Sequence, residues 1–119
     1  MVLIVGTDRV LVDLIELSLR RNGYIVKATE NPLEITPLIE EIQPQVILLD
    51  LFIPGWNTLE ILEEIKHKTN PDYCRVLVIT NLGFMEVLQQ AVLLGAGDFL
   101  IKPFDIDVLI KKINQLLMR

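Results

Sequence analysis

Short apolar runs alternate with amphipathic segments along this 119-residue chain, and this alternation strongly constrains the fold. The apolar runs suit buried strands, because they are short and end at turn residues or at charges. The segments between them repeat apolar residues every three or four positions, as a helix with one buried side does. We therefore predict strands at residues 2–5, 24–28, 46–50, 75–80 and 98–101.

The segments between the strands carry helix start and stop signals. We predict helices at residues 10–19, from Asn31 onward, and at 58–68, 84–95 and 105–118. Asn31 supplies an N-cap and Pro32 suits the first helical position, whereas Pro37 should bend or loosen the second helix. Helical crossovers imply parallel strands with helices on both faces of the sheet. The pattern thus predicts one α/β domain over residues 1–119, with five strands and five helices.

Composition excludes several classes of protein. No apolar run approaches the ~18 residues that span a bilayer, and the first residues lack the cationic start of a signal peptide. A net charge of −5 without a basic run argues against direct nucleic-acid binding. The single Cys74 cannot form an internal disulfide, and we expect a packed thiol rather than a nucleophile. We therefore expect a cytoplasmic protein that binds neither membranes nor nucleic acid directly.

Polar residues stand at the ends of three predicted strands. Asp50 ends the third strand, Thr80 ends the fourth, and Lys102 follows the fifth. Because the carboxyl ends of parallel strands meet at one edge of the sheet, these three side chains should converge. The loop of residues 6–8 after the first strand opens on the same edge.

Around these residues, the chain resembles a receiver domain of bacterial two-component response regulators over essentially its whole length. The resemblance rests on residues 46–50 followed by Pro54-Gly55, on Val78-Ile79-Thr80, and on the run from Gly95 to Phe104. It implies a flavodoxin-like, doubly wound sheet with strand order 2-1-3-4-5. It also implies a signalling module rather than an enzyme, which accepts a phosphoryl group from a partner histidine kinase.

The resemblance assigns roles to single residues. Asp50 matches the phosphoacceptor, and Thr80 matches the residue whose hydroxyl binds the new phosphoryl group. Lys102 matches the lysine that pairs first with the acceptor and then with the phosphate. Phe99 matches the aromatic residue whose rotamer follows the switch, and the Lys102-Pro103 peptide matches one that is usually cis.

The chain departs from the family at the metal site. Family members hold magnesium with the acceptor aspartate, the backbone of the residue two places later (Phe52 here), and two adjacent acids after the first strand. That acidic pair falls here on Gly6 and Thr7. Asp8 comes one place too late, and we do not expect a slip of the chain that would bring it into the pocket. Magnesium requires hard oxygen ligands, so the sequence predicts weak metal binding or none, and no other cofactor.

Two smaller departures lie beside Asp50. Asn81 follows Thr80 where the family usually has Ala or Gly, so access to Asp50 should be narrower. Asn57-Thr58 replaces the usual Asp-Gly in the loop after Asp50.

These departures support one hypothesis and leave others open. We expect an Asp50–Lys102 ion pair to hold the pocket without metal, in a receiver that acts through protein contacts with weak or no phosphorylation. The alternative is a conventional magnesium-dependent receiver, in which Asp8 or water supplies the missing ligands. A phosphatase with an aspartate nucleophile would need an acid at Phe52. An FMN carrier would need a richer phosphate-binding loop than Gly6-Thr7.

Three further features bear on partners. The helix at 84–95 carries more large apolar residues than one buried stripe needs, so we expect an exposed patch there. With the helix at 105–118, it would form a surface for a homodimer or for a signalling partner such as a kinase. Trp56 suits either packing on its loop or anchoring a partner, and His67 suits a helix-end cation.

Overall fold

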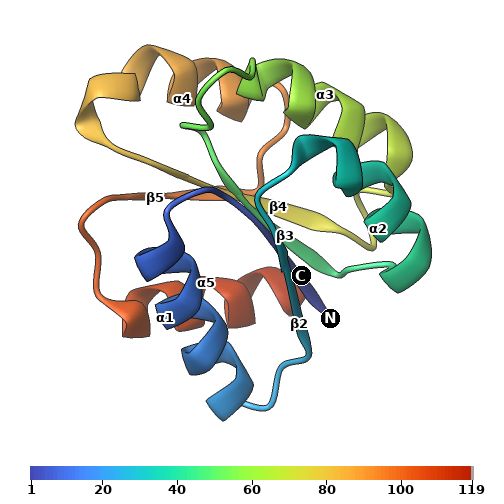
Figure 1. Ribbon diagram of the computed structural model, residues 1–119, viewed down its shortest axis with the longest axis vertical. Helices are drawn as coiled ribbons and strands as arrows, with labels where there is room; N and C mark the ends of the chain where they lie inside the picture. Colours follow the sequence, from blue (N-terminus) through green and yellow to red (C-terminus); the bar gives the residue numbers. More distant parts are fainter. Residues whose placement is uncertain (119) are drawn as a thin grey trace.

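The computed structural model describes residues 1–118, which form a five-stranded parallel sheet with helices on both faces (Figure 1). The strand order is β2-β1-β3-β4-β5, as the flavodoxin-like expectation requires. The elements are β1 (Val2–Val5), α1 (Arg9–Arg21), β2 (Val26–Thr29), η1 (Pro32–Glu34), α2 (Ile35–Ile42), β3 (Val46–Asp50), α3 (Thr58–Lys68), β4 (Arg75–Thr80), η2 (Leu82–Phe84), α4 (Met85–Leu93), β5 (Asp98–Ile101) and α5 (Ile106–Leu117).

The helices divide into two layers that sandwich the sheet. Figure 1 shows α1 and α5 on one side, with α2, α3 and α4 on the other. Alternate residues of a strand point to opposite faces, so both sets must be apolar when both faces are covered. This is why β1 and the first four residues of β3 read as unbroken apolar runs, and every residue in both strands is buried.

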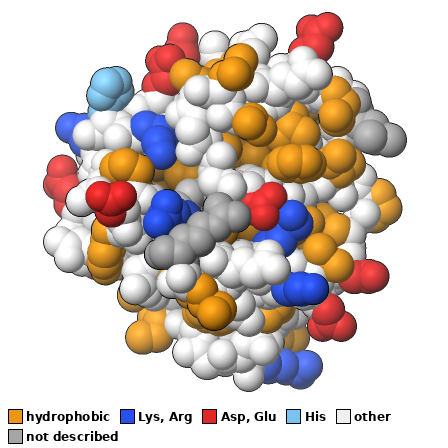
Figure 2. All heavy atoms as spheres, turned by 180° about the vertical axis from the view of Figure 1, so that it is seen from behind, with side chains coloured by type: hydrophobic (Ala, Val, Ile, Leu, Met, Phe, Trp, Pro, Cys, Tyr) orange, Lys and Arg blue, Asp and Glu red, His pale blue; other side chains and the backbone are white. Residues whose placement is uncertain are grey.

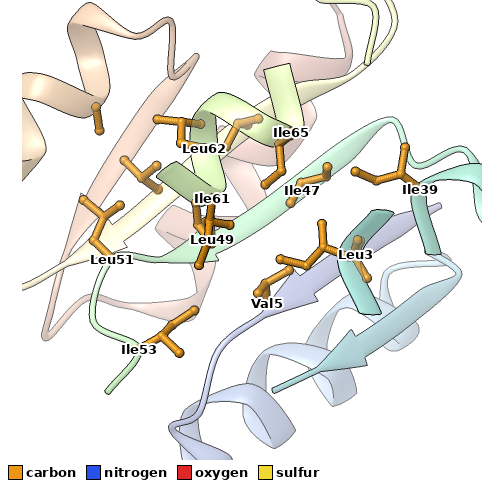
Figure 3. Packing of buried hydrophobic residues seen from close by; sticks show 14 of the residues in the cluster. Leu3, Val5, Ile39, Ile47, Leu49, Leu51, Ile53, Ile61, Leu62 and Ile65 are labelled. Atoms are coloured by element: carbon orange, nitrogen blue, oxygen red, sulfur yellow. The ribbon is translucent and has the colours of Figure 1, made fainter. Parts of the chain in front are cut away.

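Two buried clusters result, one on each side of the sheet. Leu3, Val5, Ile47 and Leu49 face α2 and α3 in the first cluster, and Figure 3 shows them meeting Ile39, Ile61, Leu62 and Ile65. The alternate residues Val2, Ile4, Val46 and Leu48 pack with α1 and α5 in the second. Burial on this scale makes the sheet a rigid platform for its carboxyl edge.

The second helix differs from the prediction. Asn31 caps a 3-10 turn, η1, by accepting a hydrogen bond from the Leu33 amide, and the α-helix begins only at Ile35. Pro37, which we expected to bend or loosen the second helix, is the third residue of α2. Pro37 lies in the first turn of α2, where no amide donor is needed within the helix.

Three other boundaries also move. The second strand begins at Val26 rather than at residue 24, and the first helix extends to Arg9–Arg21. The helix predicted at 84–95 is shorter, because α4 spans Met85–Leu93 and follows the 3-10 turn η2. None of these shifts changes the order of the elements.

The structure bears on two expectations from the sequence, one about membrane-spanning helices and one about Cys74. Among residues 1–118, no helix combines the length and the apolar character needed to cross a bilayer. Cys74 is a free, buried cysteine, and burial raises the pKa of its thiol to about 11. A thiol that stays protonated at neutral pH is a poor nucleophile. This agrees with the expectation that Cys74 is a packed thiol.

Candidate functional site

Asp50 ends β3 at the carboxyl edge of the sheet, and both of its carboxylate oxygens have partners. Asp50 Oδ1 accepts a hydrogen bond of 2.9 Å from the Phe52 amide, and Oδ2 lies 2.7 Å from Lys102 Nζ. The Asp50 residue is only 6% exposed. Removing a carboxylate from water is costly unless cations and donors replace the water, and these two contacts supply that replacement.

Lys102 reaches Asp50 from across β4. Its backbone amide donates to the Thr80 carbonyl at 2.7 Å, which continues the β4–β5 ladder one step past the end of the strand. The Lys102-Pro103 peptide is cis, as the resemblance implied. The backbone thus fixes the base of the lysine, while its ammonium lies over Asp50. A quarter of its side chain, 25%, remains exposed.

Gly6 and Thr7 lie beside Asp50 at the end of β1, and no slip of the chain occurs there. Val5 pairs with Leu49, so the next residue, Gly6, lies alongside Asp50. A Cβ atom at position 6 would lie 3.3 Å from Asp50 Cβ and 3.9 Å from Asp50 Oδ2. A side chain at position 6 would therefore start in tight contact with the Asp50 side chain, and glycine avoids that contact.

Asp8 reaches the pocket although the register is the expected one. Its Oδ1 accepts a hydrogen bond from the Leu11 amide and so caps α1, while its Oδ2 lies 3.8 Å from Lys102 Nζ. Asp8 therefore lies near Lys102 without the one-residue slip that we considered for it. The second interaction joins residues 94 positions apart in sequence, which local patterns do not reveal.

Thr80 and Asn81 lie on the wall of the pocket formed by the end of β4. Ile79 is the residue that pairs with Asp50, so Thr80 lies one residue beyond it. The Thr80 side chain is buried, and its hydroxyl donates to the Asn81 carbonyl at 3.4 Å. Asn81 Oδ1 accepts a hydrogen bond of 2.9 Å from the Gly83 amide. The amide side chain of Asn81 thus caps η2.

The loop after Asp50 is held by contacts that the sequence prediction missed. The buried Thr58 hydroxyl donates to the Leu51 carbonyl at 2.8 Å, and Asn57 caps α3 through the Leu59 amide. Asn57-Thr58 therefore fastens the two ends of the loop to each other. The signal was present in part, because Asn before a helical segment is a common N-cap.

Phe99 and α4 form an apolar surface away from Asp50. The Phe99 ring lies with Met85, Leu88, Gln89, Val92 and Leu93 around a hollow of about 390 Å³. Leu93 is 87% exposed. Figure 2 shows hydrophobic side chains gathered over α4. The surplus of apolar residues predicted for this helix thus lies exposed.

Charged groups lie at the margin of this surface. Lys112 Nζ lies 5.8 Å from the centroid of the Phe99 ring and 3.0 Å from Asp98 Oδ1. Because α4, β5 and α5 all contribute, the surface includes the strand that Lys102 directly follows.

Comparison with known proteins identifies the family to which this fold belongs. Residues 2–114 match the response regulator receiver domain. The chain belongs to this family. Receiver domains are signalling modules that interact with histidine kinases or other signalling proteins, and none of the relatives described below points to a catalytic activity for this domain.

Solved receiver structures share both the fold and part of the sequence. The receiver domain of NtrX from Brucella abortus has a TM-score of 0.90 at 28% identity, covering 99% of this chain and 98% of that one. A signal receiver domain from Bermanella marisrubri has a TM-score of 0.88 at 30% identity, covering 98% and 96%. These similarities extend over nearly the entire receiver.

A curated relative is longer than this chain. The receiver is 29% identical over 118 residues to the DNA-binding dual master transcriptional regulator RpaA of Synechocystis sp. (strain ATCC 27184 / PCC 6803 / Kazusa). The match covers 99% of this chain but 49% of RpaA. The chain therefore spans about half the length of that relative.

Proposed function

We propose that this receiver signals mainly through protein contacts, with slow or no phosphorylation of Asp50. The observation that carries the proposal is that Gly6, which lies alongside Asp50, brings no carboxylate to it, so that the charge of Asp50 is met directly by Lys102 Nζ at 2.7 Å from Oδ2. A direct ion pair supplies the positive charge that an acceptor carboxylate needs at rest. It also places an ammonium at the carboxylate oxygen that would otherwise be free for a metal or an incoming phosphoryl group.

The donor set beside Asp50 does not suit a magnesium ion. Mg²⁺ requires near-octahedral oxygen ligands, usually with one or two carboxylates free to bind it. The carboxylates here are Asp50 and Asp8, and both lie within 4 Å of the same ammonium. Among residues 1–118, no group of three or more His, Cys, Asp or Glu side chains is arranged to hold a metal. Gly6 and Thr7 add no carboxylate.

This charge balance predicts slow phosphoryl transfer. Catalysis of that reaction consists largely of positioning and of neutralising negative charge. Lys102 offers one positive charge, and Asp8 and Asp50 share it, whereas an aspartyl phosphate adds about two negative charges. We therefore infer that a phosphorylated Asp50 is poorly stabilised relative to the resting ion pair.

The surface formed by α4, β5 and α5 is the proposed route for output. Its apolar residues Met85, Val92 and Leu93 are exposed, and exposed apolar patches commonly mark interaction sites. We propose a second copy of the chain or a signalling protein such as a histidine kinase as the partner. With a net charge of −5, we propose no direct contact with nucleic acid, and we propose a cytoplasmic location.

A conventional magnesium-dependent receiver is the second candidate. The position of Asp8 favours it, because Asp8 Oδ2 already lies 3.8 Å from Lys102 Nζ. If Lys102 moved toward a phosphate, the carboxylates of Asp8 and Asp50 would both be released. Thr80 would then be available for the phosphoryl oxygens from the adjacent strand.

Intact-mass measurement distinguishes the two candidates. The receiver is incubated with acetyl phosphate and magnesium beside Asp50→Asn, which keeps the shape of the side chain but cannot accept a phosphoryl group. The proposal predicts little or no adduct over the lifetime of a typical assay. Rapid, near-complete labelling that is absent from Asp50→Asn would establish the conventional candidate instead.

A further inference from the structure

Two aromatic rings connect the loop after Asp50 to the start of α4. The ring centroids of Phe52 and Phe84 lie 5.2 Å apart, with their planes inclined at 43°. This tilted arrangement is a favourable one for aromatic pairs. Phe52 belongs to the β3–α3 loop, whereas Phe84 ends η2 and immediately precedes α4. The contact therefore joins the loop that follows Asp50 to the residue that precedes α4.

Phe52 is also bound directly to Asp50. Its amide donates the 2.9 Å hydrogen bond to Asp50 Oδ1. A hydrogen bond to a charged acceptor is roughly twice as strong as one between neutral groups. Any event that changes the charge of Asp50 therefore changes the force that holds the Phe52 backbone. The ring of Phe52, which is 50% exposed, has room to follow that backbone.

Phe84 lies at the N-terminal end of α4. It occupies the N-cap position of α4, and its side chain makes no capping hydrogen bond. Without such a cap, the first turn of a helix is held mainly by packing. A hollow of about 290 Å³ lies beside the ring pair, lined by both Phe residues, Trp56 and Val87. This space allows the two rings to separate without a clash in the core.

We infer that the Phe52–Phe84 contact is a positioning link that transmits the charge state of Asp50 to the first turn of α4. The Thr80 hydroxyl donates to the Asn81 carbonyl rather than to Asp50, so that side chain is not engaged with the acceptor in this state. The link rests on the proposed function only for the role of α4 as the output surface. The coupling itself requires neither metal nor phosphoryl group.

Hydrogen exchange measures the link without any partner or phosphodonor. Asp50→Asn removes the charge, and amide exchange of residues 86–90 is compared with the parent protein by mass spectrometry. We expect exchange in α4 to rise about fivefold, because the Asn side-chain oxygen accepts a weaker hydrogen bond from the Phe52 amide than the carboxylate does. In a Phe52→Leu background, the same Asp50→Asn change should leave α4 exchange unaltered while still altering residues 51–57.

Two further variants distinguish transmission through the ring contact from a general loosening of the fold. Phe84→Leu tests the same contact from its other side and should also uncouple α4. Phe104→Leu alters a partly buried aromatic residue of the other cluster and should leave the coupling intact. An equal response of α4 with and without the Phe52 ring would overturn the link, as would no response of α4 to Asp50→Asn in the parent. Neither result depends on whether Asp50 is ever phosphorylated, which the labelling experiment decides separately.

Discussion

Lys102 Nζ lies 2.7 Å from Asp50 Oδ2, so the end of β5 is joined to the end of β3 across the intervening strand. The same ammonium lies 3.8 Å from Asp8, which caps α1. One cation thus connects three segments that are distant in sequence. The shorter of the two contacts neutralises the buried Asp50 directly, while the more exposed Asp8 shares the same ammonium at a longer distance.

Replacing Lys102 tests how much the Asp50–Lys102 ion pair contributes to the stability of the fold. Lys102→Met should lower the free energy of unfolding by about 2–3 kcal/mol, because it leaves the buried Asp50 carboxylate without its cation. This loss is smaller than the loss expected for a fully buried ion pair, because Lys102 is partly exposed. Urea denaturation monitored by circular dichroism gives the value. The double variant Asp50→Asn/Lys102→Met should recover most of the loss, and strictly additive effects would contradict the pairing.

Restoring an acidic pair should create a metal site. Gly6→Asp/Thr7→Asp places one carboxylate next to Asp50 and a second beside it in the chain, which supplies the hard oxygen ligands that Mg²⁺ requires. Trp56 is the single tryptophan and lines the loop after Asp50, so its fluorescence can report binding. We expect a saturable response to Mg²⁺ in the double variant. Gly6→Asn/Thr7→Asn, of equal size but uncharged, should give none.

Cys74 predicts a specific dependence of stability on pH. Burial raises the pKa of its thiol from 9.0 to about 11, so the folded state holds this proton more tightly than the unfolded state. The resulting stabilisation is complete below pH 9 and is lost as the pH rises toward 11, by up to about 2 kcal/mol. Urea titrations at several pH values should show this fall. Comparison with Cys74→Ala isolates the thiol from Tyr24, whose pKa burial also raises.

Measurements of self-association can test whether the exposed face of α4 is an interface. Leu93→Glu introduces a charge at a side chain that is 87% exposed, so the fold should tolerate the change while an apolar interface should not. Sedimentation velocity over a range of concentrations should show weaker self-association in the variant. Val10→Glu is the matched control, because Val10 is 82% exposed on α1. Equal effects of both variants would argue against a specific α4 interface.

The sheet could be predicted because its periodicity is local and strong. The ranges of β3, β4, β5 and α3 coincide with the predicted 46–50, 75–80, 98–101 and 58–68. The start of the second helix could not be predicted from such periodicity. Asn31-Pro32 suits a 3-10 turn as well as an α-helix, and the Thr29 hydroxyl donates to Glu34 at 2.8 Å, which ties that turn to the end of β2. Such a contact depends on how the strand end meets the turn.

The positions of the site residues were predictable, but several of their contacts were not. Parallel strand ends place Asp50, Thr80 and Lys102 at one edge, as the alternation of elements requires. The reach of Asp8 to Lys102 and the Phe52–Phe84 ring contact join segments far apart in sequence. Side-chain rotamers decide those contacts, and the periodicity of the chain carries no information about them.

A magnesium titration followed by nuclear magnetic resonance tests directly whether Asp50 is held by Lys102 without metal. The Phe52 amide is hydrogen-bonded to Asp50 Oδ1, so its resonance reports any ion that binds that carboxylate. We predict no saturable shift of the Phe52 amide at magnesium concentrations well above those of a cell, because Lys102 already occupies Asp50. A saturable shift that disappears in Asp50→Asn would show that magnesium displaces Lys102, and would contradict a resting pocket held without metal.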